Sequence, residues 1–216
     1  MIGGKIKELL ESINQDIELV AVSKTKSNKE ILEAYDAGQK IFGENKVQEM
    51  TKKHEDLPKD IKWHMVGHVQ SNKIKYMAPY VDLVHGIDSL KSVKILNKEA
   101  KKNNRVIKCL LQLKISDEFS KFGLSKKEIE SILNSVNTLG LKNINIAGIM
   151  TIGSFTANMN TVIEEFEKTK KIFVDLKMTF PNLKILSMGM SNDYKIAIKY
   201  GSNMIRVGSL IFGKRI

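Results

Sequence analysis

The sequence predicts an α/β protein that folds as a single (β/α)₈ barrel. Eight short apolar runs are spread over the 216 residues, amphipathic patterns separate them, and no proline- or glycine-rich linker divides the chain. Short, nearly continuous apolar runs are typical of parallel strands that are covered on both faces. Eight of them alternating with helices favour a closed barrel over residues 1–216, with an open doubly wound sheet as the alternative. The nucleotide-binding motifs GxGxxG and GxxxxGK[ST] are absent, which weakens that alternative.

The eight apolar runs are the expected strands. Each is short and is followed by polar or glycine-containing sequence, as strand ends usually are. In chain order they are ELVAVS (18–23), KIFG (40–43), KWHMVG (62–67), DLVHGI (82–87), VIKCLLQLKI (106–115), INIAGIMTI (144–152), KILSMG (184–189) and NMIRVG (203–208).

Helix-start signals stand between these runs. Ser27 with Glu30, and Ser125 with Glu128, each have the spacing of a capping box, and Gly38 is suited to ending the first of these helices. Apolar stripes with helical spacing follow, and we expect them to pack on the sheet. The stripes are Ile31, Ala34, Tyr35 and Gly38; Ile129, Ile132, Leu133 and Val136; and Val162, Phe166, Thr169, Phe173 and Leu176.

The ends and the cysteine content favour a cytoplasmic protein. Residues 1–13, MIGGKIKELLESI, predict an amphipathic N-terminal helix and lack the apolar region and cleavage site of a secretory signal. No run approaches the ~18 consecutive apolar residues of a membrane span. The single cysteine, Cys109, has no partner in the chain, so we expect a buried thiol in a reducing compartment.

The net charge of +11 suits nucleic acid, an anionic surface or phosphorylated ligands. The lysines are scattered over nearly every expected helix, and no segment combines aromatic and basic residues as single-strand binders do. We therefore do not expect nucleic-acid binding to be the main role. A titration with salt against RNA would detect it, because phosphate contacts are strongly salt-dependent.

The stretch LVAVSKTK (19–26) places Lys24 at the end of the first expected strand. In one interpretation its ammonium group simply returns to water while its stem covers apolar surface. In the other, partial desolvation lowers the pKa of Lys24, and the free amine forms a Schiff base with a carbonyl. In a (β/α)₈ barrel the active site lies at this end of the strands.

The loops after the seventh and eighth strands have features of a phosphate site. Gly189 and Ser191 stand where a helix is expected to begin, and Ser191 can cap that helix. Gly208 allows close approach of the backbone to a ligand, and Ser209 offers a hydroxyl. Barrels often bind phosphate at these two loops. A lysine facing a phosphate leaves two chemistries open, a sugar-phosphate aldolase and pyridoxal 5′-phosphate (PLP).

Five motifs resemble those of the pyridoxal phosphate homeostasis protein family, the YggS-like or PROSC-like group of the alanine-racemase N-terminal-domain type. The motifs run in order through nearly the whole chain. They are AVSKTK, FGENKVQE (42–49), WHMVGHVQSNK (63–73), GIMTIG (148–153) and MGMSNDYKIAIKYGSNMIRVGSLIFG (188–213). The resemblance implies a type III PLP barrel in which Lys24 holds PLP as a Schiff base.

By the same resemblance, Ser191, Gly208 and Ser209 should hold the phosphate of PLP, and Arg206 should face its pyridine nitrogen. The family implies a protein that limits free PLP and passes it to PLP-dependent apo-enzymes. The alternative is a type III PLP enzyme such as an amino-acid racemase. Type III racemases resemble this barrel but add a C-terminal β domain, which helps to build their dimer and supplies a second acid/base residue. The sequence ends at Ile216, just after the eighth strand, so we expect no robust racemase activity and a monomer.

Two further positions, Asn45 in FGEN and His64 in WHMVGH, lie on strand ends that we expect to line the PLP pocket. His64 and His68 are four residues apart, but the segment ends a strand and has no glutamate between them, so we expect no metal. His85 is either a packed strand residue or part of the cofactor rim. His54, in a charged helix, is expected to be solvated.

Overall fold

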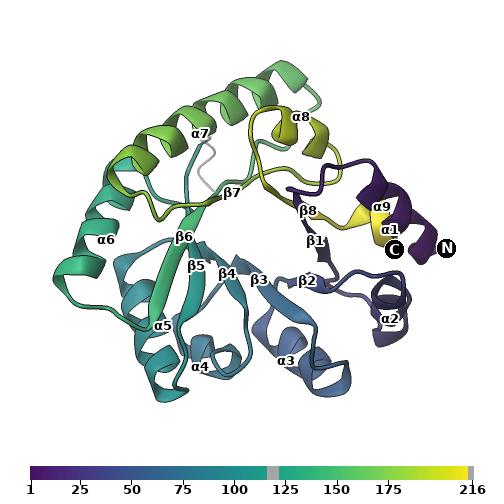
Figure 1. Cartoon of the computed structure of the whole chain (residues 1–216), viewed down its shortest axis with the longest axis horizontal. Coiled ribbons are helices and arrows are strands. Elements are labelled where there is room, and N and C mark those ends of the chain that lie inside the picture. The colour runs from purple at the N-terminus through teal and green to yellow at the C-terminus, as the bar shows by residue number, and fades with distance from the viewer. Residues whose placement is uncertain (116–121, 214–216) are drawn as a thin grey trace.

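The fold is an eight-stranded parallel barrel surrounded by helices, as Figure 1 shows. The computed structural model describes residues 1–115 and 122–213, so Ile216 lies outside the described residues. Strands pair in the order β1 to β8, and β8 pairs with β1, Val20 lying beside Arg206 in the register. The predicted (β/α)₈ barrel is therefore confirmed.

All eight predicted strands are present, most of them shorter than the apolar runs. Their bounds are β1 Glu18–Val22, β2 Ile41–Glu44, β3 Lys62–His68, β4 Leu83–Ile87, β5 Ile107–Gln112, β6 Ile144–Met150, β7 Ile185–Ser187 and β8 Met204–Val207.

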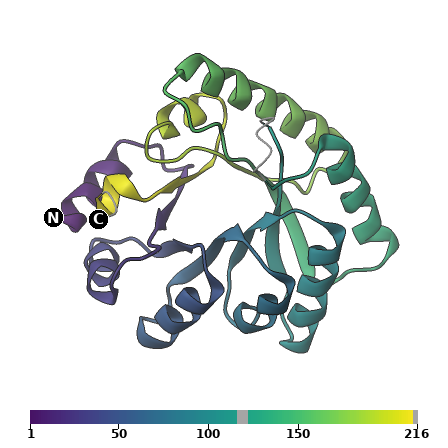
Figure 2. The same ribbon diagram turned by 180° about the vertical axis from the view of Figure 1, so that it is seen from behind.

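Helices follow the strands and form the outer layer. Their bounds are α1 Ile2–Glu11, α2 Asn28–Asp36, α3 Val47–Asp56, η1 Ser71–Lys73, α4 Ile74–Met77, α5 Leu90–Lys102, α6 Lys126–Thr138, α7 Met159–Thr179, α8 Tyr194–Lys199 and α9 Ser209–Phe212. Both predicted capping boxes form, at the starts of α2 and α6. In the views of Figures 1 and 2, α1 and α9 lie side by side next to β1.

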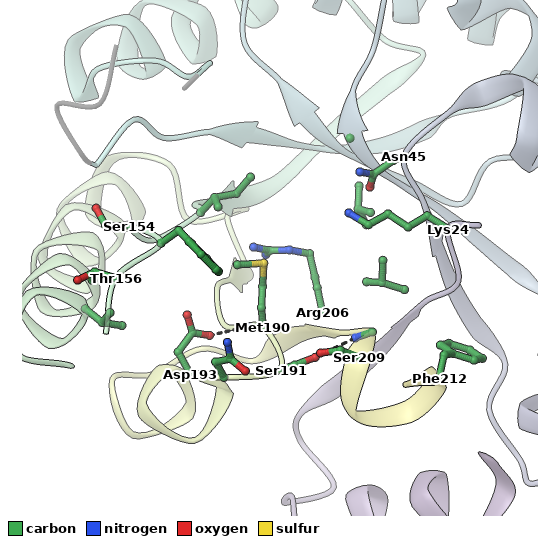
Figure 3. Close-up of a pocket in the computed structure, with 18 of the residues that line it drawn as sticks. Lys24, Asn45, Ser154, Thr156, Met190, Ser191, Asp193, Arg206, Ser209 and Phe212 are labelled. Atoms are coloured by element: carbon green, nitrogen blue, oxygen red, sulfur yellow. Dashed lines mark hydrogen bonds between the residues drawn. The ribbon is translucent and has the colours of Figure 1, made fainter. Parts of the chain in front are cut away.

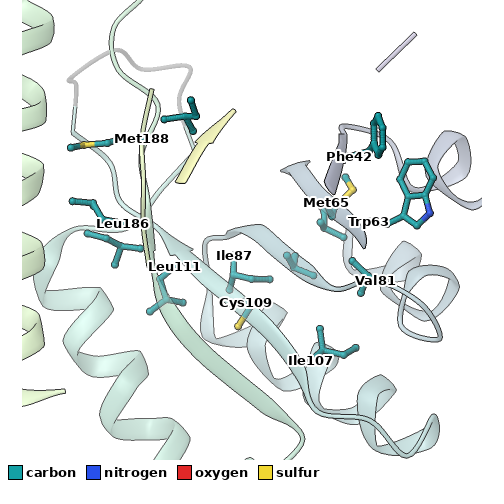
Figure 4. Close-up of a cluster of buried hydrophobic side chains, with 14 of the residues drawn as sticks. Phe42, Trp63, Met65, Val81, Ile87, Ile107, Cys109, Leu111, Leu186 and Met188 are labelled. Carbon is teal, nitrogen blue, oxygen red and sulfur yellow. The ribbon is translucent and has the colours of Figure 1, made fainter. Parts of the chain in front are cut away.

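Alternate residues of each strand face opposite sides of the sheet, and this alternation builds two cores. The outward residues pack beneath the helices in a large cluster that includes Phe42, Trp63, Met65 and Leu111 (Figure 4). Cys109 belongs to this cluster, and burial raises the pKa of its thiol to about 12, so the expected buried thiol is confirmed. The inward residues fill the barrel with a smaller apolar cluster. Its buried members are Val20, Val66, Leu83, Leu110, Ala147, Met150 and Met204.

Among the described residues, no helix is both long and apolar enough to cross a membrane.

Candidate functional site

A cavity of about 1060 Å³ opens at the carboxyl ends of the strands. Six of the seven residues predicted for the site line it. They are Lys24, Asn45, Ser191, Arg206, Gly208 and Ser209. Figure 3 shows Lys24 and Asn45 on one side of this space and Ser154 and Thr156 on the other, with Arg206 between them. The fold thus brings these six predicted residues together from four separate parts of the chain.

Lys24 continues the inward row of β1, because it lies two residues beyond Val22, which also lines the cavity. A tight turn follows it. Thr25 has a φ of +66°, which is uncommon for a residue other than glycine, and the N–H of Lys26 donates to the carbonyl of Ser23 at 3.0 Å. The turn bends the chain away while Lys24 keeps its inward direction.

A buried ionic cluster beneath this turn holds its backbone. The ammonium group of Lys53 donates to the carbonyl of Ser23 at 2.8 Å, to Glu44 at 2.8 Å and to Glu49 at 2.7 Å. The Ser23 hydroxyl donates to Glu44 at 2.5 Å, and the N–H of Thr25 donates to Glu49 at 2.6 Å. Both neighbours of Lys24 are therefore fixed to β2 and α3.

Glu44 is the most buried member of this cluster. Its carboxylate is completely buried, and its second oxygen, Oε2, has no hydrogen-bond partner. Burial raises the pKa of Glu44, while the charge of Lys53 opposes that shift. The sequence reasoning missed Glu44 and Lys53. The available signal was a carboxylate that ends an apolar run in FGEN and a Glu49–Lys53 pair at helical spacing.

Arg206 is buried at the end of β8 and points into the cavity (Figure 3). Its Nη1 donates to the Ser187 hydroxyl at 2.6 Å and its Nη2 donates to the Thr151 carbonyl at 2.8 Å. Burial lowers the pKa of Arg206 to about 10, and the nearby Asp193 opposes this shift. Arg206 therefore remains charged at neutral pH and presents a fixed cation to the cavity.

Ser191, Gly208 and Ser209 meet at the loops after β7 and β8. The Ser191 hydroxyl oxygen accepts from the N–H of Gly208 at 3.2 Å and of Leu210 at 3.4 Å. The expectation that Ser191 caps the helix after β7 is wrong. That helix, α8, begins at Tyr194 without a side-chain cap, and Ser191 instead satisfies N–H groups at the start of α9.

The walls between these polar groups are largely apolar. Val22, Val66 and Ile152 line the deeper part, and Met190 and Phe155 lie nearer the mouth, where Phe155 is 93% exposed. Such a cavity suits a flat organic ligand that carries a few polar groups.

The prediction that His64 lines the pocket is wrong. Its side chain is 1% exposed and lies inside the barrel, where its Nδ1 is 3.1 Å from Nε2 of His85. Val66, two residues further along β3, takes the place at the cavity wall. His85 is packed in the interior and is not on the rim, which matches the first of its two predicted roles.

The remaining histidines lie apart from this pair. His68 lines the cavity, stacks on Phe122 and lies 3.0 Å from a carboxylate oxygen of Asp88. His54 is half-buried: it stacks on Tyr80 with ring centroids 4.0 Å apart and its Nδ1 is buried, so its side chain is only partly solvated. No cluster of three or more potential metal ligands occurs within residues 1–115 and 122–213.

The sequence profile described as alanine racemase, N-terminal domain, matches residues 4–215. The pyridoxal phosphate homeostasis protein of Vibrio alginolyticus is 38% identical over 206 residues, covering 93% of this chain and 88% of its own. The protein of the same name from Escherichia coli K12 is 37% identical over 208 residues, covering 93% and 87%.

Solved structures show the same architecture. PipY of Synechococcus elongatus, solved with PLP bound, aligns with a TM-score of 0.90 and 32% identity over 99% of this chain and 100% of its own. Alanine racemase from Bartonella henselae aligns with a TM-score of 0.70 at 17% identity, over 99% of this chain and 60% of its own, a likeness of fold alone.

Proposed function

The chain belongs to the alanine racemase N-terminal domain family, and we propose that it is a PLP-binding protein that holds the cofactor as a Schiff base on Lys24 and acts in intracellular PLP homeostasis. The observation that carries this proposal is the joint exposure of Lys24, Arg206 and the Ser191–Gly208–Ser209 loops to one cavity. The single buried cysteine supports a cytoplasmic location.

The residues around the cavity fit the aldehyde, the pyridine nitrogen and the phosphate of PLP. Lys24 supplies a primary amine for the aldehyde, and its condensation with the aldehyde releases one water. Arg206 supplies N–H donors for the pyridine nitrogen, and a permanent cation there disfavours protonation of that nitrogen. Ser191 and Ser209 supply hydroxyls for the phosphate. The apolar wall of Val22 and its neighbours suits the ring.

PLP bound in this way supplies an electrophilic aldehyde and a conjugated ring that can accept electrons. The protein's residues determine how tightly the group is held and how far it is exposed. The turn at Thr25 orients Lys24, and the Ser187 and Thr151 bonds orient Arg206. We further propose that PLP-dependent apo-enzymes receive PLP from this cavity, whose mouth carries exposed apolar side chains.

Borohydride labelling tests the assignment of Lys24. Borohydride reduces a Schiff base to a stable amine, so protein incubated with PLP should carry one pyridoxyl group, which peptide mass spectrometry should place on Lys24. Lys24→Ala should abolish the label and leave the fold intact, because this side chain lies at the cavity and not in either core. Labelling at another lysine, or none at saturating PLP, would contradict the proposal.

Lys26 provides the matched control. It also lines the cavity, but its ammonium group donates to the Phe212 carbonyl at 3.0 Å and lies 3.2 Å from Glu30. Lys26→Ala should keep the label on Lys24. In the same assay, pyridoxal should bind at least about 10-fold more weakly than PLP, because each charge-assisted phosphate bond contributes about 1.5–3 kcal/mol. Equal affinity would remove the case for a phosphate site.

A further inference from the structure

The barrel interior contains a continuous row of polar side chains that leads from the opposite end of the barrel to Arg206. The row consists of Asp82, His64, His85, Ser187 and Arg206. His85 and Ser187 are completely buried, His64 is 1% exposed and Arg206 is 5% exposed. Asp82 precedes β4, at the amino ends of the strands, and its side chain is 37% exposed. The cavity lies at the carboxyl ends, so the row crosses the barrel.

Each member contacts the next. Arg206 Nη1 lies 2.6 Å from Ser187 Oγ, which lies 3.5 Å from His85 Nδ1, at the limit of a hydrogen bond. His85 Nε2 lies 3.1 Å from His64 Nδ1. His64 Nε2 lies 3.5 Å from a carboxylate oxygen of Asp82. Apolar residues of the inner cluster, such as Leu83 and Val66, occupy other inward positions on the same strands as the two histidines.

The two ends of the row determine the direction of its hydrogen bonds. A guanidinium only donates, and a carboxylate only accepts. Asp82 accepts from Nε2–H of His64, so a singly protonated His64 offers Nδ1 as an acceptor to Nε2–H of His85. Nδ1 of His85 then accepts the hydroxyl proton of Ser187, whose oxygen accepts from Nη1 of Arg206.

We propose that His64 and His85 are positioning residues for Arg206. Each ring carries its proton on Nε2, the two rings orient Ser187, and Ser187 holds the guanidinium toward the cavity. The proposal deepens the proposed function, since it matters for PLP only if Arg206 faces the pyridine nitrogen. It gives a function to His64, which does not itself line the cavity.

The surroundings of His85 favour its uncharged form. Burial lowers the pKa of His85 well below its usual range, and the charge of Arg206 acts in the same direction. The His64 side chain lowers the pKa of Asp82, and Lys108 and Lys62 reinforce this shift, so Asp82 remains an acceptor at neutral pH.

At the cavity end, Asp193 faces Arg206 and favours its charged form. The carboxylate of Asp193 accepts from the N–H of Met190 at 2.5 Å. Burial raises the pKa of Asp193, and the charge of Glu165 acts in the same direction. One carboxylate therefore lies at each end of the row, Asp193 near Arg206 and Asp82 near His64. Apolar residues at positions 64 and 85 would fill the same space without orienting Ser187.

Nitrogen-15 NMR of the imidazoles in protein without PLP tests the proton positions directly. The sequence has four histidines, so each can be assigned by substitution. We expect both His64 and His85 to carry a proton on Nε2 and none on Nδ1 at pH 7. An Nδ1–H tautomer or a doubly protonated ring for either residue at pH 7 would overturn the proposal. This measurement needs no bound PLP, so it stands even if the borohydride experiment fails.

Paired variants test the effect on binding. His64→Asn keeps an acceptor at the position of Nδ1, whereas His64→Leu removes it. We expect His64→Leu to raise the apparent Kd for PLP about 10-fold, the effect of one lost hydrogen bond, and His64→Asn to stay within about threefold. His54→Gln, on the outer surface against Tyr80, should leave the Kd unchanged. If His64→Leu binds PLP with wild-type affinity, or if both His64 variants lose affinity equally, His64 and His85 only fill space and the proposal is wrong.

Discussion

Replacement of Lys53 by methionine tests whether the buried ionic cluster supports the turn that presents Lys24. Methionine matches the length of the lysine stem, so it should fill the same space without a cavity. The change removes the donor to Glu44, to Glu49 and to the carbonyl of Ser23. Glu44 is completely buried and would lose its main opposite charge.

Removal of one partner from a buried ion pair costs about 3–5 kcal/mol, because the remaining charge is left without compensation. The side chain of Lys53 is 7% exposed and that of Glu44 is 0% exposed, so water screens this cluster little. We therefore expect Lys53→Met to lower the free energy of unfolding by about 3 kcal/mol or more at pH 8. The loosened turn should also weaken PLP binding.

The loss should depend on pH with a defined sign. Burial already raises the pKa of Glu44, and the absence of Lys53 raises it further. A carboxyl group whose pKa is raised in the folded state favours folding at low pH and loses that contribution as the pH rises through the folded pKa. Within that window the free energy of unfolding changes by up to about 1.4 kcal/mol per pH unit. The deficit of the variant should therefore shrink by at least about 1 kcal/mol between pH 8 and pH 5.

Urea unfolding of wild type and variant at both pH values measures these differences. Lys102→Met is the matched control. Its ammonium group lies 2.8 Å from Glu99, but its side chain is 58% exposed, and exposed pairs contribute little. We expect a change below about 0.5 kcal/mol at either pH. A Lys53→Met loss smaller than about 1 kcal/mol, or one that is equal at pH 5 and pH 8, would refute the reasoning.

Two further predictions concern Gly189 and Cys109. Gly189 has a φ of +98°, and a Cβ there would lie 2.6 Å from a methyl group of α8. Gly140 has a φ of +60°, but a Cβ there would meet open space. Gly189→Ala should therefore lower the melting temperature markedly more than Gly140→Ala. Equal shifts in thermal unfolding would count against this packing argument. The buried Cys109 thiol, with its pKa raised to about 12, should react with a thiol reagent more than about 100-fold more slowly in folded protein than in urea, and comparable rates would contradict its burial.

The strands could be predicted from the sequence because burial on both faces leaves an apolar signature. The ends of the strands were less predictable, because apolar residues continue beyond the hydrogen-bonded ladder. The run 106–115 extends past β5, and Leu113 there makes only an isolated bridge to Leu124. Met188 likewise follows β7 but belongs to the core between sheet and helices.

The supporting contacts of the site could not be predicted, because they join residues that are distant in the sequence. Lys53 meets Ser23 across 30 positions and Arg206 meets Thr151 across 55. Ser191 illustrates the same limit. Its residue type indicated an N-terminal cap, but two helices begin nearby, and only the folded chain decides that the N–H groups it satisfies belong to α9.

The error at His64 follows from depth along a strand. Inward residues recur every second position, about 6–7 Å apart along the barrel wall, so those near the carboxyl end of a strand reach the cavity and deeper ones do not. On β1 the cavity is lined by Val22 and Lys24, and on β3 by Val66 and His68. His64 therefore lies one layer below the cavity wall. A histidine at that depth can affect a ligand only through the side chain above it, and the contacts of His64 lead through His85 and Ser187 to Arg206.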